Sequence, residues 1–415
     1  MPDTLAKQIV LDVLQREPDL SGLGDIPTLR SNEGERLLRW LDHSGLALSF
    51  LRSVQCSDEA AHLSKDWRNV LKRRMDRNAT RLKDMLGEFR RLNDAFRANG
   101  VKCVTMKGFS LLPDFYDDAV LRHQTDFDFL VEPNDVESAA AVLQSCGYST
   151  PRLSRTEESS FTTPLSKVPS HKDDLYAIQQ HRQVDLHVSL TEKSEWIQLR
   201  VPDDCMGRVV EMNLYGIQFW SLALPDRFVC QVLHAFRHCF RSWVRLSWLM
   251  EIGRCMEMHA ENDDLWSNVI ELAGNDIVTK RIFGFVLCLT NHLFKFRIPS
   301  QLRAWTEQGM TKSMRVWLDH FSEKWALADW PGNLSNLLLA PEFIPDRKLR
   351  NEYLASRLFP KKTVAAVESL RGPATKKPLL GNVQQWIYVA QRSRVHLKDL
   401  LALPADLLRW KFVLR

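Results

Sequence analysis

The apolar positions of the first hundred residues recur at intervals of three or four, which predicts amphipathic helices. This spacing covers residues 5–15 and 33–55, with a break near Gly45. A longer helix is predicted over 66–99, and Gly100 is expected to end it. Its apolar stripe consists of Leu71, Met75, Ala79, Leu82, Leu86, Phe89, Leu92 and Phe96. We expect this stripe to pack against a sheet that follows in the chain.

Beyond Gly100 the chain changes to short apolar runs that are separated by turns and brief helices. These runs predict strands at 101–105, 126–131, 176–180 and 183–190, and a hairpin over 209–220. Short helices are expected over 109–116 and 133–146, and a loop or irregular hairpin over 149–172. Strands that alternate with helices in this order indicate a small mixed α/β sheet.

From Pro225 onward the helical spacing returns, and no further strand is predicted. The helices are expected at 225–240, 245–260, 262–273, 275–294, 311–327 and 381–402, with breaks near 330–346 and 371–382. The predicted fold class is therefore α+β. It comprises an N-terminal helical region (1–78), a core with a small mixed β-sheet (79–222) and a large C-terminal helical domain (223–415).

Composition places the chain among ordinary globular proteins, since 45% of its 415 residues are hydrophobic and 26% are charged. The longest apolar run, 282–290, is too short to span a bilayer, so no transmembrane segment is expected. The N-terminus has no apolar stretch of the kind found in secretory signals. Eight cysteines without a CxxC pair indicate neither a disulfide framework nor a zinc ribbon. A cytoplasmic protein is the expectation.

Charge is distributed unevenly along the chain, whose net charge is +5. Residues 341–415 carry 15 Lys and Arg against 6 Asp and Glu, whereas the remainder carries 41 against 45. Such a basic tail suits an acidic partner, a nucleic acid or an anionic membrane; the alternative is a solvated helical face. The last stretch, 395–415, mixes Leu, Trp, Lys and Arg and has the composition of a membrane-surface segment. Docking onto the helical domain is the more ordinary expectation.

Two aspartates, Asp126 and Asp128, stand one residue apart inside the predicted strand 126–131. Side chains at i and i+2 of a strand point to the same face, roughly 6.5–7 Å apart. Two adjacent buried carboxylates are costly unless a positive charge lies between them, and a divalent metal supplies it. Asp185, in the apolar run 184–188, is the expected third acid. Three such carboxylates can bind two Mg²⁺, with Mn²⁺ as the alternative ion, and this arrangement suits phosphoryl or nucleotidyl transfer.

The pair Lys107-Gly108 follows a predicted strand and precedes a short helix. Gly108 permits close backbone approach to a phosphate, and Lys107 can contact a triphosphate as a point charge. Ser110 can add a hydroxyl to this turn. Arg122 can either contact the triphosphate or hold the carboxylates in place.

The run K-G-x-S-L-L, then R-x3-D-F-D-F-L-V and later V-D-L-H, resembles the nucleotidyltransferase superfamily with the DNA polymerase β-like core. It is most similar to a bacterial group labelled uncharacterised nucleotidyltransferases. The stretch 233–255 also resembles the helical half of that group, with Glu251 where an Asp is typical. The resemblance covers roughly residues 80–260.

The resemblance implies Asp126, Asp128 and Asp185 as metal ligands and the Lys107-Gly108 turn as the phosphate-binding element. The implied reaction is Mg²⁺-dependent transfer of a nucleoside monophosphate from an NTP such as ATP. The acceptor is a hydroxyl of a small molecule, a glycan, or a peptide or protein that the sequence does not identify. Asp185 can take the proton, or metal coordination alone can suffice. The alternatives are an AMPylating enzyme of this fold, an inactive nucleotide-binding scaffold and a metal-dependent glycosyltransferase, because glycosyltransferases also use a DxD pair.

Three histidines accompany these motifs. His187 lies two residues after Asp185, where either a structural hydrogen bond or an approach to the metal or substrate is expected. His234 and His238 lie on one face of a predicted helix, at a spacing that can bind zinc. The glutamate of the HExxH motif and a third ligand are missing, so packing or substrate contact is the preferred interpretation.

Overall fold

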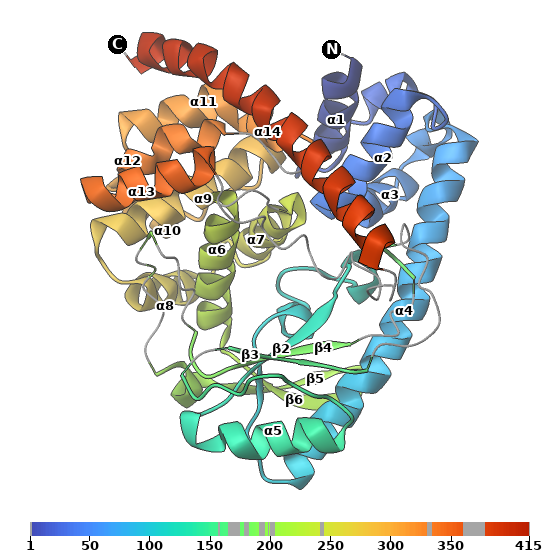
Figure 1. Ribbon diagram of the computed structural model, residues 1–415, viewed down its shortest axis with the longest axis vertical. Helices are drawn as coiled ribbons and strands as arrows, with labels where there is room; N and C mark the ends of the chain where they lie inside the picture. Colours follow the sequence, from blue (N-terminus) through green and yellow to red (C-terminus); the bar gives the residue numbers. More distant parts are fainter. Residues whose placement is uncertain are drawn as a thin grey trace.

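A computed structural model describes residues 2–156, 158–164, 175–177, 182–190, 196–197, 199, 204–240, 245–329, 334–359 and 378–414. In the lower half of the molecule in Figure 1, a mixed sheet lies beside one long helix and above helix α5 (Val136–Ser145), and most of the other helices lie above the sheet. The predicted α+β class is thereby confirmed. Parts of two predicted segments, 165–172 of the loop 149–172 and 178–180 of the strand 176–180, lie outside the described residues, and the described residues 176–177 form a turn instead of a strand.

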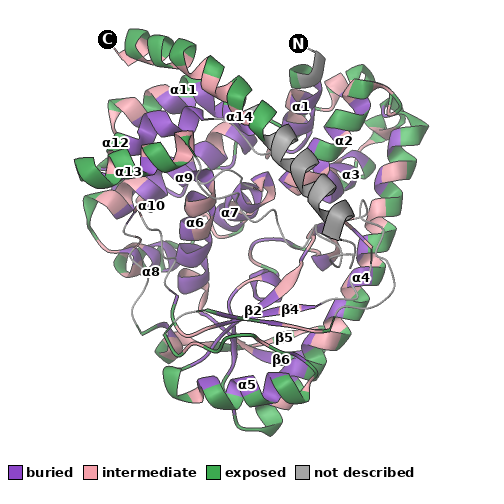
Figure 2. Cartoon of the chain, in the orientation of Figure 1, coloured by how far each residue is buried: buried purple, intermediate pink, exposed green. Residues whose placement is uncertain are grey.

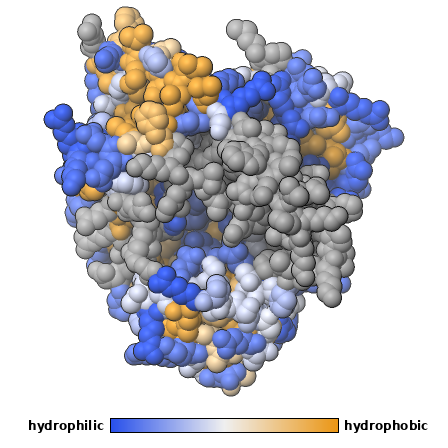
Figure 3. All heavy atoms as spheres, viewed as in Figure 1, coloured by the Kyte–Doolittle hydropathy of each residue, from blue (hydrophilic) through white to orange (hydrophobic). Residues whose placement is uncertain are grey.

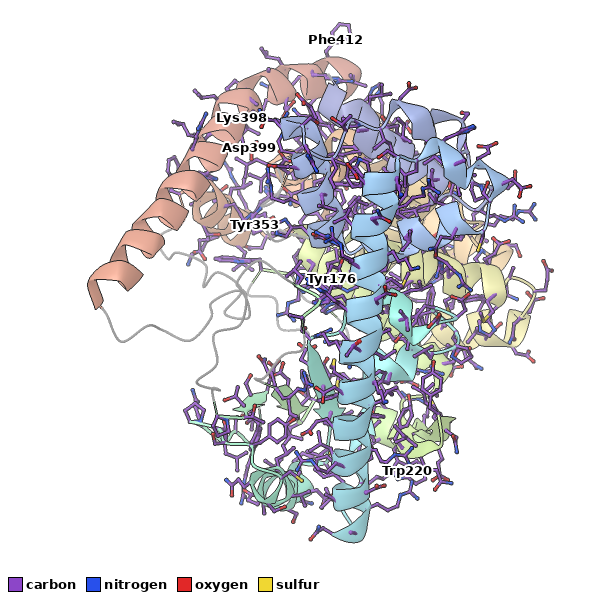
Figure 4. All side chains as sticks on the ribbon, turned by 90° about the vertical axis from the view of Figure 1, so that its right-hand side faces the viewer. Tyr176, Trp220, Tyr353, Lys398, Asp399 and Phe412 are labelled. Atoms are coloured by element: carbon purple, nitrogen blue, oxygen red, sulfur yellow. The ribbon has the colours of Figure 1, made fainter. Side chains whose placement is uncertain are left out.

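The N-terminal helices agree with the predicted apolar spacing. They are α1 (Pro2–Val13), α2 (Asn32–Ser44), α3 (Ala47–Gln55) and α4 (Lys65–Ala98). Gly45 separates α2 from α3 in the left-handed conformation, with φ 74°, which a residue without Cβ adopts at little cost. Helix α4 runs along one whole side of the protein (Figures 1 and 4) and contacts both α3 and the sheet helix α5 (Val136–Ser145).

The described sheet has six strands in the order β3-β4-β2-β1-β6-β5. They are β1 (Val104–Thr105), β2 (Asp126–Leu130), β3 (Ser159–Thr162), β4 (Gln183–His187), β5 (Val210–Leu214) and β6 (Ile217–Ser221). Strand β2 pairs parallel with β4 and antiparallel with β1, while β1 pairs parallel with β6. The two hairpin-type pairs, β3 with β4 and β5 with β6, are antiparallel. The central strand β2 is therefore covered on both edges.

Aromatic rings fix α4 on one face of this sheet. The Phe89 ring lies 5.9 Å from that of Phe127 and 6.2 Å from that of Phe129, and it meets the Phe219 ring edge-on at 5.0 Å. Phe96 makes a second edge contact with Phe129 at 5.3 Å. The expectation that the stripe of this helix packs against the sheet is thus confirmed. Because side chains alternate along β2, Asp126 and Asp128, which alternate with Phe127 and Phe129, must point to the other face.

The C-terminal helices form the layer that faces those aspartates. They are α6 (Leu224–Phe240), α7 (Leu246–Met258), α8 (Asp263–Ala273), α9 (Ile277–Phe294), α10 (Ser300–Glu307), α11 (Lys312–Ala326), α12 (Ala340–Phe343), α13 (Arg347–Leu358) and α14 (Pro378–Leu414). Helix α9 contacts α6, α7, α10 and α11, and buried residues predominate where these helices meet (Figure 2). It is the one described helix long and apolar enough to cross a membrane, and 61% of it is buried inside the protein, as in a core helix.

Several elements differ from the sequence predictions. Strand β3 lies inside the segment expected to be a loop or irregular hairpin, where its pairing with β4 overrides a weak local pattern. The helix expected over 109–116 is only a 3-10 turn at Gly108–Leu111, and the strand expected over 101–105 has two residues. Helices α10 and α13 were not predicted. Helix α14 continues through Pro404 to Leu414, beyond the end at 402 that the sequence predicts.

Candidate functional site

Strand β2 places Asp126 and Asp128 on the face opposite α4. Both are partly exposed, whereas Phe127 and Phe129 between and beyond them are buried. This alternation follows directly from the two-residue period of a strand. The two predicted metal ligands are thus neighbours on one face.

Strand β4 brings the third predicted acid to the same face. In the parallel register between the two strands, Asp128 is paired with Asp185 and Asp126 with Gln183. Adjacent strands lie about 4.8 Å apart, and paired residues project to the same side. Gln183 Nε2 donates to both carboxylate oxygens of Asp185, each at 3.0 Å. An acid 57 residues away in sequence therefore lies beside the DxD pair.

The proximity of these carboxylates changes their pKa values. Burial raises the pKa of Asp185 to about 7, and repulsion by Asp128 and then Asp126 adds to the effect. Burial, followed by repulsion from Asp128, also raises the pKa of Asp126, although Lys107 and Arg122 oppose the shift. An added positive charge would therefore lower the raised pKa values of Asp126 and Asp185.

Asp128 is the acid that already has cationic neighbours. Lys107 Nζ lies 3.4 Å from Asp128 Oδ1, and His187 Nε2 lies 3.1 Å from the same oxygen. Burial alone would raise the pKa of this carboxyl, but the Lys107 charge and the His187 hydrogen bond outweigh it and hold the pKa well below its usual range. His187 therefore has the structural hydrogen bond that was one of its two expected roles.

The donor set suits a divalent cation, since carboxylates are the ligands that Mg²⁺ and Mn²⁺ take from proteins. Such a cation would offset the burial and the repulsion that raise the pKa values of Asp126 and Asp185. However, the three carboxylates are not already arranged around a common metal position. Within the described ranges no three His, Cys, Asp or Glu side chains are placed so that they could hold a metal ion.

The Lys107-Gly108 turn lies directly beside these acids. Gly108 has φ 65°, and a Cβ added there would lie 2.4 Å from Gln124 Nε2. That same nitrogen donates to the backbone oxygen of Asp126 at 2.9 Å. The Tyr116 hydroxyl donates to the carbonyl of Gly108 at 2.7 Å. Glycine is therefore required both by the backbone conformation and by the close approach of Gln124, which also supports the start of β2.

We expect Gly108→Ala to reduce the free energy of unfolding by about 2–3 kcal/mol, because a left-handed backbone costs about 1–2 kcal/mol for alanine and the clash with Gln124 adds to it. Gly100→Ala is the matched control, since Gly100 has φ 68° and open space around its Cβ position. Urea unfolding of both variants measures the difference. Equal losses in the two variants would show that Gln124 moves away without cost.

Ser110 and Arg122, both predicted to contact phosphate or, for Arg122, to hold the carboxylates, have protein partners in the structure. Ser110 is fully buried, and its Oγ donates to the Lys107 carbonyl at 3.3 Å. Arg122 Nε donates to Glu251 Oε1 at 2.9 Å, and its guanidinium lies 5.9 Å from the Tyr116 ring. Burial would lower the pKa of Arg122, but the Glu251 charge outweighs it and raises the pKa. These contacts assign Ser110 to the turn and Arg122 to the junction with α7.

Glu251 anchors that junction from the helical side. Its other oxygen, Oε2, accepts from Gln231 Nε2 of α6 at 2.9 Å, and its side chain is only 5% exposed. Arg122 comes just before β2, so one carboxylate connects both helices to the strand that carries the acids. Glu251 is the residue that replaces the typical Asp of the resembled group.

Sequence reasoning missed a group of buried arginines near the start of β2. Arg81 of α4 donates to the backbone oxygen of Gln124, and Arg245 Nη1 donates to the His123 carbonyl at 3.0 Å. Burial lowers the pKa of Arg81 to about 9, and repulsion from Arg182 and Arg245 adds to the effect. The one available signal was that Arg81 lies next to the apolar stripe of its helix, where a charged residue is unusual. Together these residues create a positive field around Asp126.

His234 and His238 of α6 pack with Trp248 of α7. The two imidazole rings are 4.6 Å apart, and they lie 4.6 Å and 4.7 Å from the indole ring. The charge of His234 also lowers the pKa of Asp128, which places this histidine on the side of the acids. The arrangement matches packing or substrate contact, the interpretation that the sequence favoured.

Comparison with known proteins agrees with this geometry. A family model described as uncharacterised nucleotidyltransferase matches residues 30–295, which is more than half of the chain. This range includes the sheet, the three acids, the Lys107-Gly108 turn and the helices α6 and α7. Neither the curated proteins nor the solved structures gave a match.

Proposed function

Since this chain belongs to the uncharacterised nucleotidyltransferase family, we propose that it transfers a nucleoside monophosphate from an NTP to a hydroxyl acceptor. The acceptor oxygen would bond to the α-phosphorus while the bond from that phosphorus to the bridging oxygen breaks, and pyrophosphate would leave. General nucleotidyl transfer follows from the family. The NTP donor, the hydroxyl acceptor and the metal dependence are the proposal.

The observation that carries this proposal is the register that pairs Asp128 with Asp185 next to Asp126. Asp126, Asp128 and Asp185 would hold Mg²⁺, with Mn²⁺ as the alternative. When bound, the metal would neutralise charge on the triphosphate and lower the pKa of the attacking hydroxyl. The raised pKa values of Asp126 and Asp185 support this, because a cation would offset the repulsion that causes them.

Other side chains of the site would bind the donor and move the proton. Lys107, which lies 3.4 Å from Asp128, would exchange that contact for a phosphate oxygen. The positive charges of Arg81 and Arg245 would attract the triphosphate towards Asp126. Asp185 would accept the hydroxyl proton directly, with coordination of the hydroxyl by the metal as the alternative.

The test is a screen with α-labelled ATP, GTP, CTP and UTP in the presence of Mg²⁺ or Mn²⁺, with cell extract as the source of acceptors. We expect label transfer, pyrophosphate release, and a Mg²⁺-dependent rise in melting temperature with one NTP. The double variant Asp126→Ala/Asp128→Ala should lose all three. Undiminished binding of Mg·NTP by that variant would overturn the metal site.

The same screen, with UDP-sugars added as competing ligands, distinguishes the alternative activities. Label on protein would identify an AMPylating enzyme, and binding of a UDP-sugar in preference to any NTP would identify a glycosyltransferase. Nucleotide binding that depends on the acids but gives no pyrophosphate with any extract would indicate a scaffold.

A further inference from the structure

Four large apolar side chains are exposed along one face of the C-terminal half of α14. Leu397, Leu401, Leu408 and Phe412 are 57%, 72%, 70% and 81% exposed. Their intervals of four, seven and four residues place them on a single stripe of a helix, with exposed Pro404 between them. The stripe is about 22 Å long, from 1.5 Å of rise per residue. We call this set, with Pro404, the outer stripe.

The opposite face of the same helix already holds it to the protein. The Trp410 ring packs edge-on against Phe321 of α11 at 5.9 Å. Asp406 receives two hydrogen bonds from Lys324, at 2.6 and 2.7 Å. Helix α14 is therefore docked by its inner face, and the outer stripe is not the surface that attaches it.

The surface view shows the result. Hydrophobic side chains gather over the C-terminal half of α14 in Figure 3, and Phe412 projects from the end of the helix away from the protein in Figure 4. Contiguous exposed apolar surface of this kind marks a protein or membrane contact.

The acids of this segment lie on a different face from three of its cations, while Arg409 lies over the Phe321 ring of α11 at 5.5 Å. Arg394, Lys398 and Lys411 are exposed and lie beside the outer stripe in the helical projection. Both acids between residues 394 and 412 lie on the inner side: Asp406 pairs with Lys324, and burial raises the pKa of partly buried Asp399 to about 6. The outward surface thus combines hydrophobic and cationic side chains without an acid.

We propose that the outer stripe docks the protein peripherally on an anionic phospholipid surface. An interfacial helix inserts its apolar face to a depth of about 5–10 Å, while its cations contact lipid phosphates. The leucines and Phe412 would enter the acyl boundary, and Arg394, Lys398 and Lys411 would lie at the headgroups. A second copy fits less well, because two-fold pairing of this face would bring its cations together. This proposal does not depend on the transfer reaction.

The test is sedimentation of the full-length protein with vesicles of phosphatidylcholine alone or with about one-third phosphatidylglycerol. We expect binding to the anionic vesicles, weakening as salt is raised from about 0.1 to 0.5 M. Leu401→Ser/Leu408→Ser should weaken it at least about tenfold. The matched control is Leu5→Ser/Leu349→Ser, which changes leucines that are 58% and 41% exposed elsewhere. It should bind like the wild type.

A charge variant keeps the test decisive if the serine variant fails to fold. Arg394→Gln/Lys398→Gln/Lys411→Gln alters only exposed side chains, so it should melt like the wild type yet lose binding to anionic vesicles. The proposal is overturned if the wild type binds neither vesicle or both equally. It is also overturned if the wild type is a dimer that Leu401→Ser/Leu408→Ser converts to monomer, because the stripe would then be a contact between copies.

Discussion

Asp185→Asn should make the metal-free protein more stable while it removes most of the transfer activity. The carboxyl of Asp185 is buried beside two other acids, and its pKa rises from 3.8 to about 7. At pH 8 the folded protein therefore holds an unfavourable charge that the unfolded chain solvates freely. Each pKa unit is worth about 1.4 kcal/mol, so we expect a gain of about 2–4 kcal/mol in the free energy of unfolding.

The pH dependence of this gain has a definite direction. Between pH 3.8 and about 7 the folded wild type keeps a proton on Asp185 that the unfolded chain has lost. Unfolding releases that proton, so the wild type loses stability relative to Asp185→Asn as the pH rises through this range. The difference should be constant above pH 7 and absent below about pH 4. Urea unfolding in EDTA at several pH values measures it.

The same substitution should reduce kcat/KM by about 10²–10³, because one metal ligand and the proposed proton acceptor are lost together. Glu132→Gln is the matched control: it neutralises an exposed acid just beyond the end of β2, and it should alter neither activity nor stability. Added Mg²⁺ should stabilise the wild type but not Asp185→Asn. If Asp185→Asn were less stable than the wild type in EDTA, the buried charge of Asp185 would not be unfavourable in the folded protein, contrary to this prediction.

Glu251→Leu should reduce the free energy of unfolding by about 3–5 kcal/mol, because it leaves a buried guanidinium without its charge partner. Arg122 is 16% exposed and Glu251 is 5% exposed, so water cannot readily replace the lost contact. Gln231 loses its acceptor as well. Thermal or urea unfolding gives the magnitude.

The double variant Arg122→Met/Glu251→Leu distinguishes this cause from simple loss of packing. Removing both charges with side chains of similar volume should restore most of the stability, since buried ion pairs are often replaceable by apolar residues. Activity should remain low if Arg122 positions β2 for catalysis. A double variant as unstable as Glu251→Leu would show that packing, and not the buried charge, is responsible.

The sequence predicted the parts of the site that follow from local patterns. The two-residue period of β2 already implied that Asp126 and Asp128 share a face, and the apolar run around Asp185 marked it as a second strand. The helical spacing before Gly100 predicted α4 and the face that it buries. In each case the information lies within a few consecutive residues, because strand and helix periods are local.

Other features could not be predicted because they depend on contacts between distant segments. Strand β3 has a weak pattern of its own and forms because β4 offers it an edge. Arg81 resembled a surface residue of α4, and only the packing of that helix against the start of β2 buries it. Helix α14 passes Pro404, where a local rule predicts a break.

By itself the sequence determined the fold class and placed Asp126, Asp128 and Asp185 in strands and Gly108 in a turn, since these follow from residue type and short-range spacing. Only the tertiary structure decided which charges meet. It paired Asp128 with Asp185 through strand register and assigned Arg122 to Glu251. It also turned the acids of α14 inward, while the leucines and cations of the outer stripe and its flanks face outward. Which charges interact depends on their distance in space. In a chain of 415 residues, that distance is defined only once the helices have packed against the sheet.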